Sequence, residues 1–116
     1  MRTLTARYCD AVARFDDARF GALWAEDADW VVPGVATTSG RARIVRLFAK
    51  LRGGYDLVLQ ELLSGFVVPG ASTHEAAARW QIRELQWRDG APPGCVLGVY
   101  TDRLVRTDGE WRRSGR

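Results

Sequence analysis

The spacing of apolar residues changes at Gly53-Gly54, and this change constrains the fold more than any other feature of the sequence. Before it, apolar side chains recur at helical spacing. That spacing predicts three helices: one over 4–15, one capped by Asp16 or Asp17, and one capped by Ser39. After it come four long runs of β-forming residues separated by turn signals, Tyr55–Val68, Thr73–Trp87, Cys95–Thr107 and Glu110 to the end. Helices followed by strands are typical of the α+β class.

The turn signals predict how these elements are arranged. Pro33-Gly34 closes a short strand over Ala28–Val32, and Asp108-Gly109 is a strong signal for a two-residue hairpin between the last two runs. The second helix is expected to bury Phe20, Leu23 and Trp24, and the third to bury Ile44, Leu47, Phe48 and Leu51. We therefore expect three N-terminal helices packed on one face of a strongly curved, mixed but mostly antiparallel sheet.

A length of 116 residues allows one domain, covering residues 1–116. Hydrophobic residues make up 47% of the chain and charged residues 27%, which are ordinary values for soluble globular proteins. No apolar run approaches the roughly 20 residues that cross a bilayer. These features predict a soluble, cytoplasmic protein that does not bind membranes.

Charge and composition argue against several kinds of site. The formal net charge is +3, but the arginines are scattered and Lys50 is the only lysine, so a nucleic-acid-binding surface is not expected. Cys9, Cys95 and the single histidine, His74, do not have zinc-ligand spacing. We expect no metal and no cofactor, two cysteines that act as small buried hydrophobic residues, and an exposed His74 in a loop.

Three stretches of sequence resemble the SnoaL-like proteins of the nuclear-transport-factor-2-like superfamily. They are Ala6-Arg7-Tyr8, the segment from Leu23 to Gly34, and the segment from Tyr100 to Arg112. The resemblance spans essentially the whole chain. It implies a cone-shaped α+β barrel whose mouth, under the helices, holds a small apolar ligand.

Within this superfamily, ketosteroid isomerase is the nearest catalytic comparison, because a Tyr and a protonated Asp there hold an oxyanion while a second Asp moves the proton. The resemblance places Tyr8 and Asp102 at the two oxyanion positions, which makes them the candidate catalytic residues. Val32 occupies the position of the base and carries no proton. The superfamily's dehydratases use paired histidines, which one histidine cannot supply.

Strand alternation gives Asp102 two possible roles. If Asp108-Gly109 forms the turn, Leu104 pairs with Arg113, and Asp102 lies diagonal to Arg113 on the same inward face. Asp102 is then either an oxyanion donor, kept protonated by an apolar pocket, or a structural ion pair with Arg113 that stays ionised. Both roles remain open at this point.

The same alternation suggests which other residues face the ligand. Trp30 and Val32 share one face of the first strand, Trp80 and Tyr100 are expected to face inward, and Glu61 does so only if the leucines beside it do. We expect an enzyme of the cyclase, isomerase or dehydratase type, acting as in polyketide-type metabolism on an apolar or polycyclic molecule with a carbonyl, enol or phenol oxygen. The alternative is a non-catalytic ligand-binding or dimerisation module of the same fold.

A homodimer is also expected. The resemblance implies association through the outer sheet face, where Leu85, Trp87 and Val105 can leave apolar area.

Overall fold

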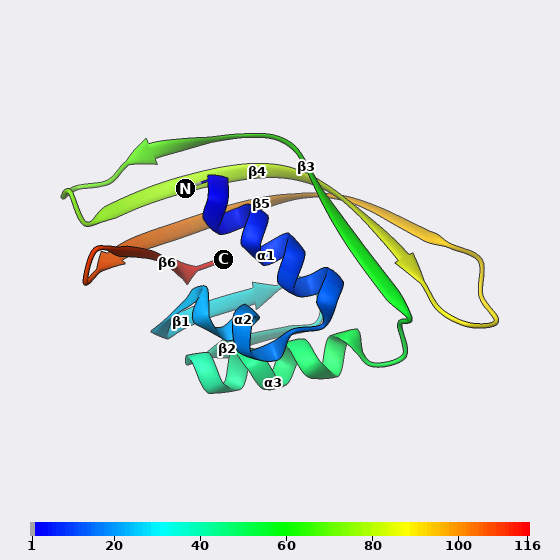
Figure 1. The fold of residues 1–116 in the computed structure, drawn as a ribbon. Coiled ribbons are helices and arrows are strands. Elements are labelled where there is room, and N and C mark those ends of the chain that lie inside the picture. The colour runs from blue at the N-terminus through cyan, green and yellow to red at the C-terminus, as the bar shows by residue number, and fades with distance from the viewer. Residues whose placement is uncertain (1) are drawn as a thin grey trace.

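The computed structural model describes residues 2–116, which form three helices and six strands (Figure 1). Their bounds are α1 Arg2–Arg14, α2 Asp17–Ala22, β1 Trp24–Val32, β2 Ala36–Ser39, α3 Arg41–Arg52, β3 Leu57–Pro69, β4 Glu75–Trp87, β5 Gly94–Thr107 and β6 Glu110–Gly115.

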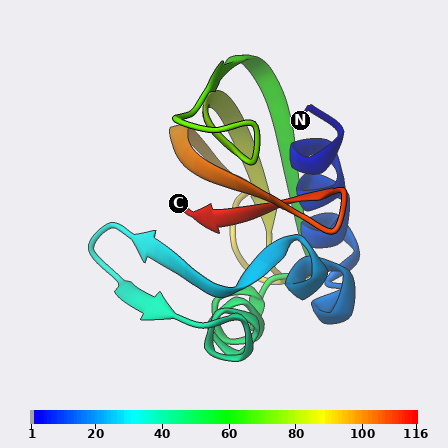
Figure 2. The same ribbon diagram turned by 90° about the vertical axis from the view of Figure 1, so that its left-hand side faces the viewer.

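All six strands belong to one sheet in the order β2-β1-β6-β5-β4-β3. Every neighbouring pair is antiparallel except β1 and β6, which are parallel. Seen from the side, the three helices lie together next to the sheet (Figure 2). The α+β class, the three N-terminal helices and the mixed, mostly antiparallel sheet are therefore confirmed. The strong curvature and cone shape stay predictions.

The hairpin between β5 and β6 has the predicted register. Asp108 and Gly109 both have a positive φ, as a type I′ turn requires, and Thr107 pairs with Glu110. Leu104 pairs with Arg113, and a bulge follows, so that Arg103 pairs with Gly115. The bulge advances β6 by one residue, which brings Arg116 level with Asp102.

The region between α1 and α3 differs from the sequence expectation. The second helix ends at Ala22, and Trp24 instead begins β1, where it pairs with Arg113 of β6. Strand β1 therefore starts four residues earlier than predicted, because a strand from the far end of the chain supplies its partner. The hairpin strand β2 was not predicted at all.

The helix caps were predicted in part. Asp16 caps α2 as expected, since its side chain accepts a hydrogen bond from the Arg19 backbone N–H. The prediction that Ser39 caps α3 was wrong: Gly40 holds that position, and the Ser39 hydroxyl donates to Asp29 at 2.6 Å. Ser39 is still part of β2, so its hydroxyl stays beside β1.

An aromatic cluster joins the helices to the sheet. Phe20 is fully buried, stacks on Phe48 with ring centroids 3.9 Å apart, and lies within 6.0 Å of Tyr8, Trp24 and Trp30 by the same measure. The cluster fixes α1, α2, α3 and β1 relative to one another. It thereby positions the side chains that face the cavity described below.

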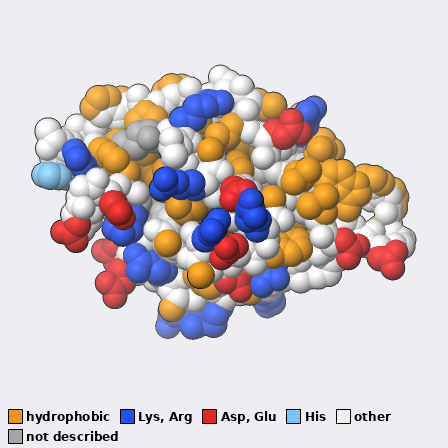
Figure 3. All heavy atoms as spheres, viewed as in Figure 1, with side chains coloured by type: hydrophobic (Ala, Val, Ile, Leu, Met, Phe, Trp, Pro, Cys, Tyr) orange, Lys and Arg blue, Asp and Glu red, His pale blue; other side chains and the backbone are white. Residues whose placement is uncertain are grey.

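Hydrophobic side chains also remain on the surface, including a group over the end of the molecule where β3, β4 and β5 project (Figure 3). The residues expected to form an apolar outer face, Leu85, Trp87 and Val105, are half-buried. Strand pairing places a different exposed set on that face: Leu57, Leu59, Phe66, Val68, Leu97 and Val99.

Candidate functional site

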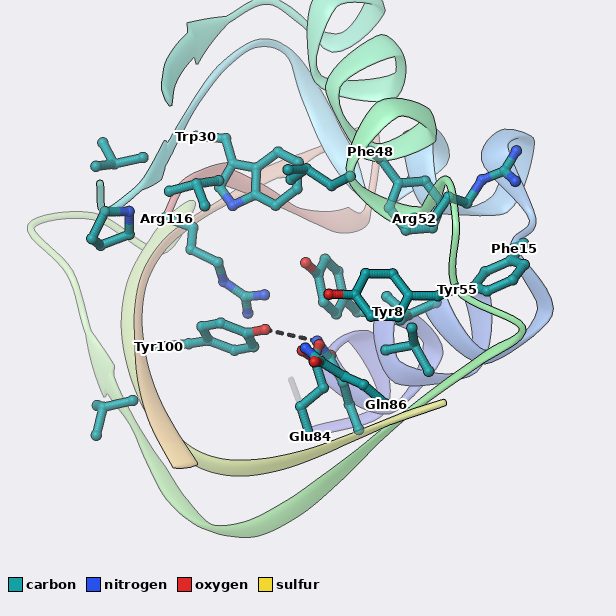
Figure 4. Close-up of a pocket in the computed structure, with 18 of the residues that line it drawn as sticks. Tyr8, Phe15, Trp30, Phe48, Arg52, Tyr55, Glu84, Gln86, Tyr100 and Arg116 are labelled. Atoms are coloured by element: carbon teal, nitrogen blue, oxygen red, sulfur yellow. Dashed lines mark hydrogen bonds between the residues drawn. The ribbon is translucent and has the colours of Figure 1, made fainter. Parts of the chain in front are cut away.

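A cavity of about 540 Å³ lies between the helices and the inner side of the sheet (Figure 4). Six aromatic side chains contribute to its wall: Tyr8, Phe15, Trp30, Phe48, Tyr55 and Tyr100. A few polar groups project among them, from Gln60, Glu84, Gln86, Arg52 and Arg116. Its volume falls in the range of roughly 300–1,000 Å³ that is typical of small-molecule sites. A mostly apolar wall with a few polar groups is typical of such sites as well.

Tyr8 is held where the helical spacing predicted, on the buried face of α1. Its ring contacts Phe20 and meets Tyr100 edge-on, with centroids 6.0 Å apart. Burial raises the pKa of the Tyr8 hydroxyl, although the charges of Arg116 and Arg113 oppose this. The hydroxyl therefore remains a protonated hydrogen-bond donor at neutral pH.

Asp102 is fully buried but is not among the residues that line the cavity. Its carboxylate accepts two hydrogen bonds from Arg116, at 2.6 and 2.7 Å, and lies 3.2 Å from Nε of Arg113. Burial alone would raise the pKa of Asp102, but the hydrogen bonds and charges of the two arginines outweigh it and hold that pKa below its ordinary value. An ionised carboxylate accepts hydrogen bonds and cannot donate one. The structural ion pair with Arg113 is thus present, and a protonated Asp102 that donates to an oxyanion does not fit this geometry.

Arg116 supplies the cationic group of the cavity, and sequence reasoning missed it. Its guanidinium lies 3.5 Å from the centroid of the Tyr100 ring and 4.4 Å from that of Tyr8 (Figure 4). The side chain is only 3% exposed, and its Nη1 has no hydrogen-bond partner among residues 2–116. Burial disfavours the charge, but the hydrogen bonds to Asp102 and the electrostatic interactions with Asp102, Tyr8 and Tyr100 raise the pKa of Arg116.

The charges of Asp102, Arg113 and Arg116, which form one buried ion-pair cluster, do not cancel. Burial and the charge of Arg116 lower the pKa of Arg113 to about 10, so Arg113 is still protonated at neutral pH. Two arginines and one carboxylate leave one positive charge beside the cavity. Because the side chains of all three residues are buried, water screens that charge only weakly from a ligand in the cavity.

Of the residues predicted to contact a ligand, Trp30, Val32 and Tyr100 line the cavity together with Tyr8. Trp80 is not among the lining residues: it is buried in the core, where a Cβ on Gly65 would collide with its ring.

Glu61 lies outside the cavity as well, on the outer face of β3. There it accepts two hydrogen bonds from Arg83, which lower its pKa. The leucines beside it, Leu57 and Leu59, are exposed on the same face, so the condition set for an inward Glu61 is not met.

A second polar group that sequence reasoning missed lies on the inner face of β3 and β4. Glu84 accepts a hydrogen bond from the Gln60 amide at 2.8 Å and another from the Gln86 amide at 2.6 Å. The same Gln60 amide donates to the Tyr100 hydroxyl at 2.9 Å. Alternation from Trp80 and Ile82 would have placed Glu84 on the inward face, because residues two apart along a strand share a side.

The remaining predicted residues lie away from the cavity wall. His74 is exposed in the turn before β4, as predicted. Cys9 is half-buried, but Cys95 is exposed, so its expected burial was wrong: it lies on the outer face of β5, opposite Leu85. Among residues 2–116, no group of three or more His, Cys, Asp or Glu side chains could hold a metal ion, and no helix is long and apolar enough to cross a membrane.

Comparison with known families agrees with the fold. The family model for the SnoaL-like domain matches residues 1–116, and the chain therefore belongs to the SnoaL-like family of the NTF2-like superfamily. No curated protein matches significantly.

Three solved structures illustrate the likeness of fold. A provisionally assigned scytalone dehydratase from Novosphingobium aromaticivorans DSM 12444 has 18% identity and a TM-score of 0.91 over 99% of this chain and 77% of its own. A hexachlorocyclohexane dehydrochlorinase, LinA type 2, has 20% identity and a TM-score of 0.87 over 97% and 76% of the two chains. A provisionally assigned NTF2-like dehydratase from Streptomyces avermitilis has 19% identity and a TM-score of 0.84 over 97% and 88%. At these identities the likeness shows the fold alone.

Proposed function

We propose that this protein is an enzyme that binds a small, largely apolar or polycyclic molecule in the cavity and stabilises an enolate-like negative charge on its carbonyl, enol or phenol oxygen. The observation that carries the proposal is Arg116, a residue of the aromatic cavity wall whose guanidinium is buried and whose Nη1 has no hydrogen-bond partner among residues 2–116. The Tyr8 hydroxyl is a second donor in the same wall. The reaction would be of the cyclase, isomerase or dehydratase type.

The physical basis is electrostatic. A buried N–H donor that lacks a partner is costly, so a ligand oxygen that accepts from it gains more than it would in water. Donors aimed at the place where charge develops stabilise a transition state most when their position is fixed in advance. Asp102 fixes Arg116 in this way, because it accepts from Nε and Nη2 and leaves Nη1 free.

The family comparison supports chemistry of this kind. Dehydration and dehydrochlorination, the reactions named for structures that share the fold, each remove a proton and a leaving group from neighbouring atoms. Both develop negative charge that a fixed cation can stabilise.

A planar phenol tests the proposal, since its phenolate mimics an enolate. We expect 2-naphthol to bind with one molecule per chain, and Arg116→Met and Tyr8→Phe each to weaken binding about 10- to 150-fold, the value of one hydrogen bond to a charged group. Isothermal titration calorimetry near pH 9, below the pKa of Arg113 so that the site keeps its charge, would measure this. Arg112→Met is the control, because Arg112 pairs with exposed Glu110 on the same strand. The melting temperature of each variant shows that it is folded. Failure of the wild type to bind, or unchanged affinity in Arg116→Met, would contradict the proposal.

Val32 favours a second candidate, a ligand-binding module without catalysis. Its apolar side chain lines the cavity where the resemblance to ketosteroid isomerase calls for a base. A protein that binds 2-naphthol but promotes no proton transfer would match this candidate.

We also propose that a second copy of the chain covers the outer sheet face. Leu97 is 72% exposed there, and Phe66 is 58% exposed. We expect a particle of twice the monomer mass of 13.0 kDa at micromolar concentration, and Leu97→Glu to shift it to the monomer. Sedimentation velocity over a dilution series measures both. A wild-type monomer at every concentration would refute the dimer.

A further inference from the structure

The three polar side chains Gln60, Glu84 and Gln86 form an ordered group inside the cavity. Gln60 and Glu84 face each other across β3 and β4, and Gln86 follows two residues further along the same face of β4. Each carboxylate oxygen of Glu84 accepts one amide N–H, at 2.8 and 2.6 Å. The amides fix the orientation of the carboxylate and still leave it lone pairs that can accept a proton.

Glu84 differs in its partners from Asp102 and Glu61, the other two carboxylates considered for the site. Asp102 is paired with two arginines, and Glu61 is paired with Arg83. Within residues 2–116, no arginine or lysine forms an ion pair with Glu84. The hydrogen-bond partners of Glu84 are therefore two neutral amides, and both of its carboxylate oxygens lie on the inner face of the sheet.

The carboxylate and the free guanidinium N–H belong to the same wall. The Gln60 amide that donates to Glu84 also donates to the Tyr100 hydroxyl, and the Tyr100 ring lies against the Arg116 guanidinium (Figure 4). Glu84 and Arg116 therefore line one cavity, with Gln60 and Tyr100 connecting them along its wall. Sequence reasoning had left the acceptor unidentified, because Val32 carries no ionisable group.

We infer that Glu84 is the general base of the site and that its substrates are enolisable ketones fused to an apolar ring system. This inference rests on the proposed function. Glu84 takes a proton from the carbon next to the carbonyl. The C–H electron pair forms the new C=C bond, and the carbonyl π pair moves onto the oxygen, which accepts hydrogen bonds from Arg116 and Tyr8. Return of a proton from the Glu84 carboxyl to carbon reverses the step without any further reactant.

Deuterium exchange measures this step without knowledge of the natural substrate. The probe is 2-tetralone, whose enolate has the ring skeleton and oxygen position of 2-naphtholate. We expect the wild type in D₂O to exchange the α-hydrogens of 2-tetralone faster than buffer does, as followed by proton NMR. General-base catalysis contributes roughly 10²–10⁴-fold, so Glu84→Gln should lose a factor of that size.

Two further variants make the result specific. Glu61→Gln is the matched control: it removes a carboxylate from the outer face of the neighbouring strand, and its exchange rate should equal that of the wild type. Glu84→Asp keeps the charge but withdraws the carboxylate by one methylene, which should slow exchange on the order of 10²-fold. The naphthol affinity of Glu84→Gln should be retained, because the oxyanion donors are intact.

The outcomes separate the inference from the function on which it rests. Slower exchange in Glu84→Gln with retained naphthol binding supports both. Wild-type exchange that persists in Glu84→Gln overturns Glu84 as the base, and so does naphthol binding by a wild type that does not accelerate exchange. A wild type that does not bind naphthol overturns the proposed function itself.

Discussion

Replacing Asp102 by Asn is expected to lower the free energy of unfolding by about 3–5 kcal/mol, because removal of one partner from a buried ion pair leaves the other charge uncompensated. In this protein the loss leaves two arginines buried together, Arg113 and Arg116, with no carboxylate between them. Urea denaturation followed by tryptophan fluorescence measures the change. Asp10→Asn is the control, since Asp10 forms an exposed pair with Arg14 within one helix, and its effect should stay within about 0.5 kcal/mol.

The same pair makes stability depend on pH in a defined direction. The pKa of Asp102 is lower in the folded protein than in the unfolded chain, where it is about 3.9. The stability it contributes is therefore fully present above the unfolded value and is lost as the pH falls through the folded value. Below about pH 4 the wild type should lose stability more steeply than Asp102→Asn. Parallel acid profiles, or a difference below 1 kcal/mol at pH 7, would show that the ion pair does not stabilise the fold.

Phe20→Ala is expected to cost about 3–5 kcal/mol, the usual range when a large aromatic side chain is removed from a core. Phe20 is fully buried and stacks on Phe48, and its ring also contacts Tyr8. The cavity left behind borders the side chain that faces the ligand, so naphthol affinity should fall as well. Val35→Ala is the control, since Val35 is 62% exposed and lies in the turn between β1 and β2, away from the outer sheet face. Equal melting temperatures for the two alanine variants would contradict this description of the core.

The predictions that succeeded depended on local chemistry. The change of periodicity at Gly53-Gly54 predicted the α+β class, because helical and strand spacings are incompatible with each other. Asp108-Gly109 predicted the β5–β6 register, because that dipeptide favours a turn with two positive φ angles. Helical spacing alone predicted that Tyr8 is buried.

The predictions that failed depended on contacts between distant parts of the chain. Trp24 was expected in a helix because its neighbours suit one, but pairing with Arg113 places it in β1. Arg116 was missed because strict alternation puts it on the opposite face from Arg113, and the bulge before Gly115 reverses that relationship. Glu84 is different. The alternation that placed Trp80 and Ile82 inward also applies to Glu84, so its inward position could have been predicted from the sequence.

Strand β6 lies between β1 and β5, so the same strand both completes the sheet and carries the arginines beside the cavity. The hairpin of β1 and β2 reaches the rest of the sheet only through β6, and the backbone of Arg116 bonds to both Asp29 and Val31 of β1. A local opening that detaches β6 would remove both buried arginines and split the sheet in the same event. Because β1 and β6 are separated by most of the chain, their pairing has a high contact order and is expected to form late during folding. We therefore expect the two buried arginines to reach the cavity only when the sheet is completed, late in folding.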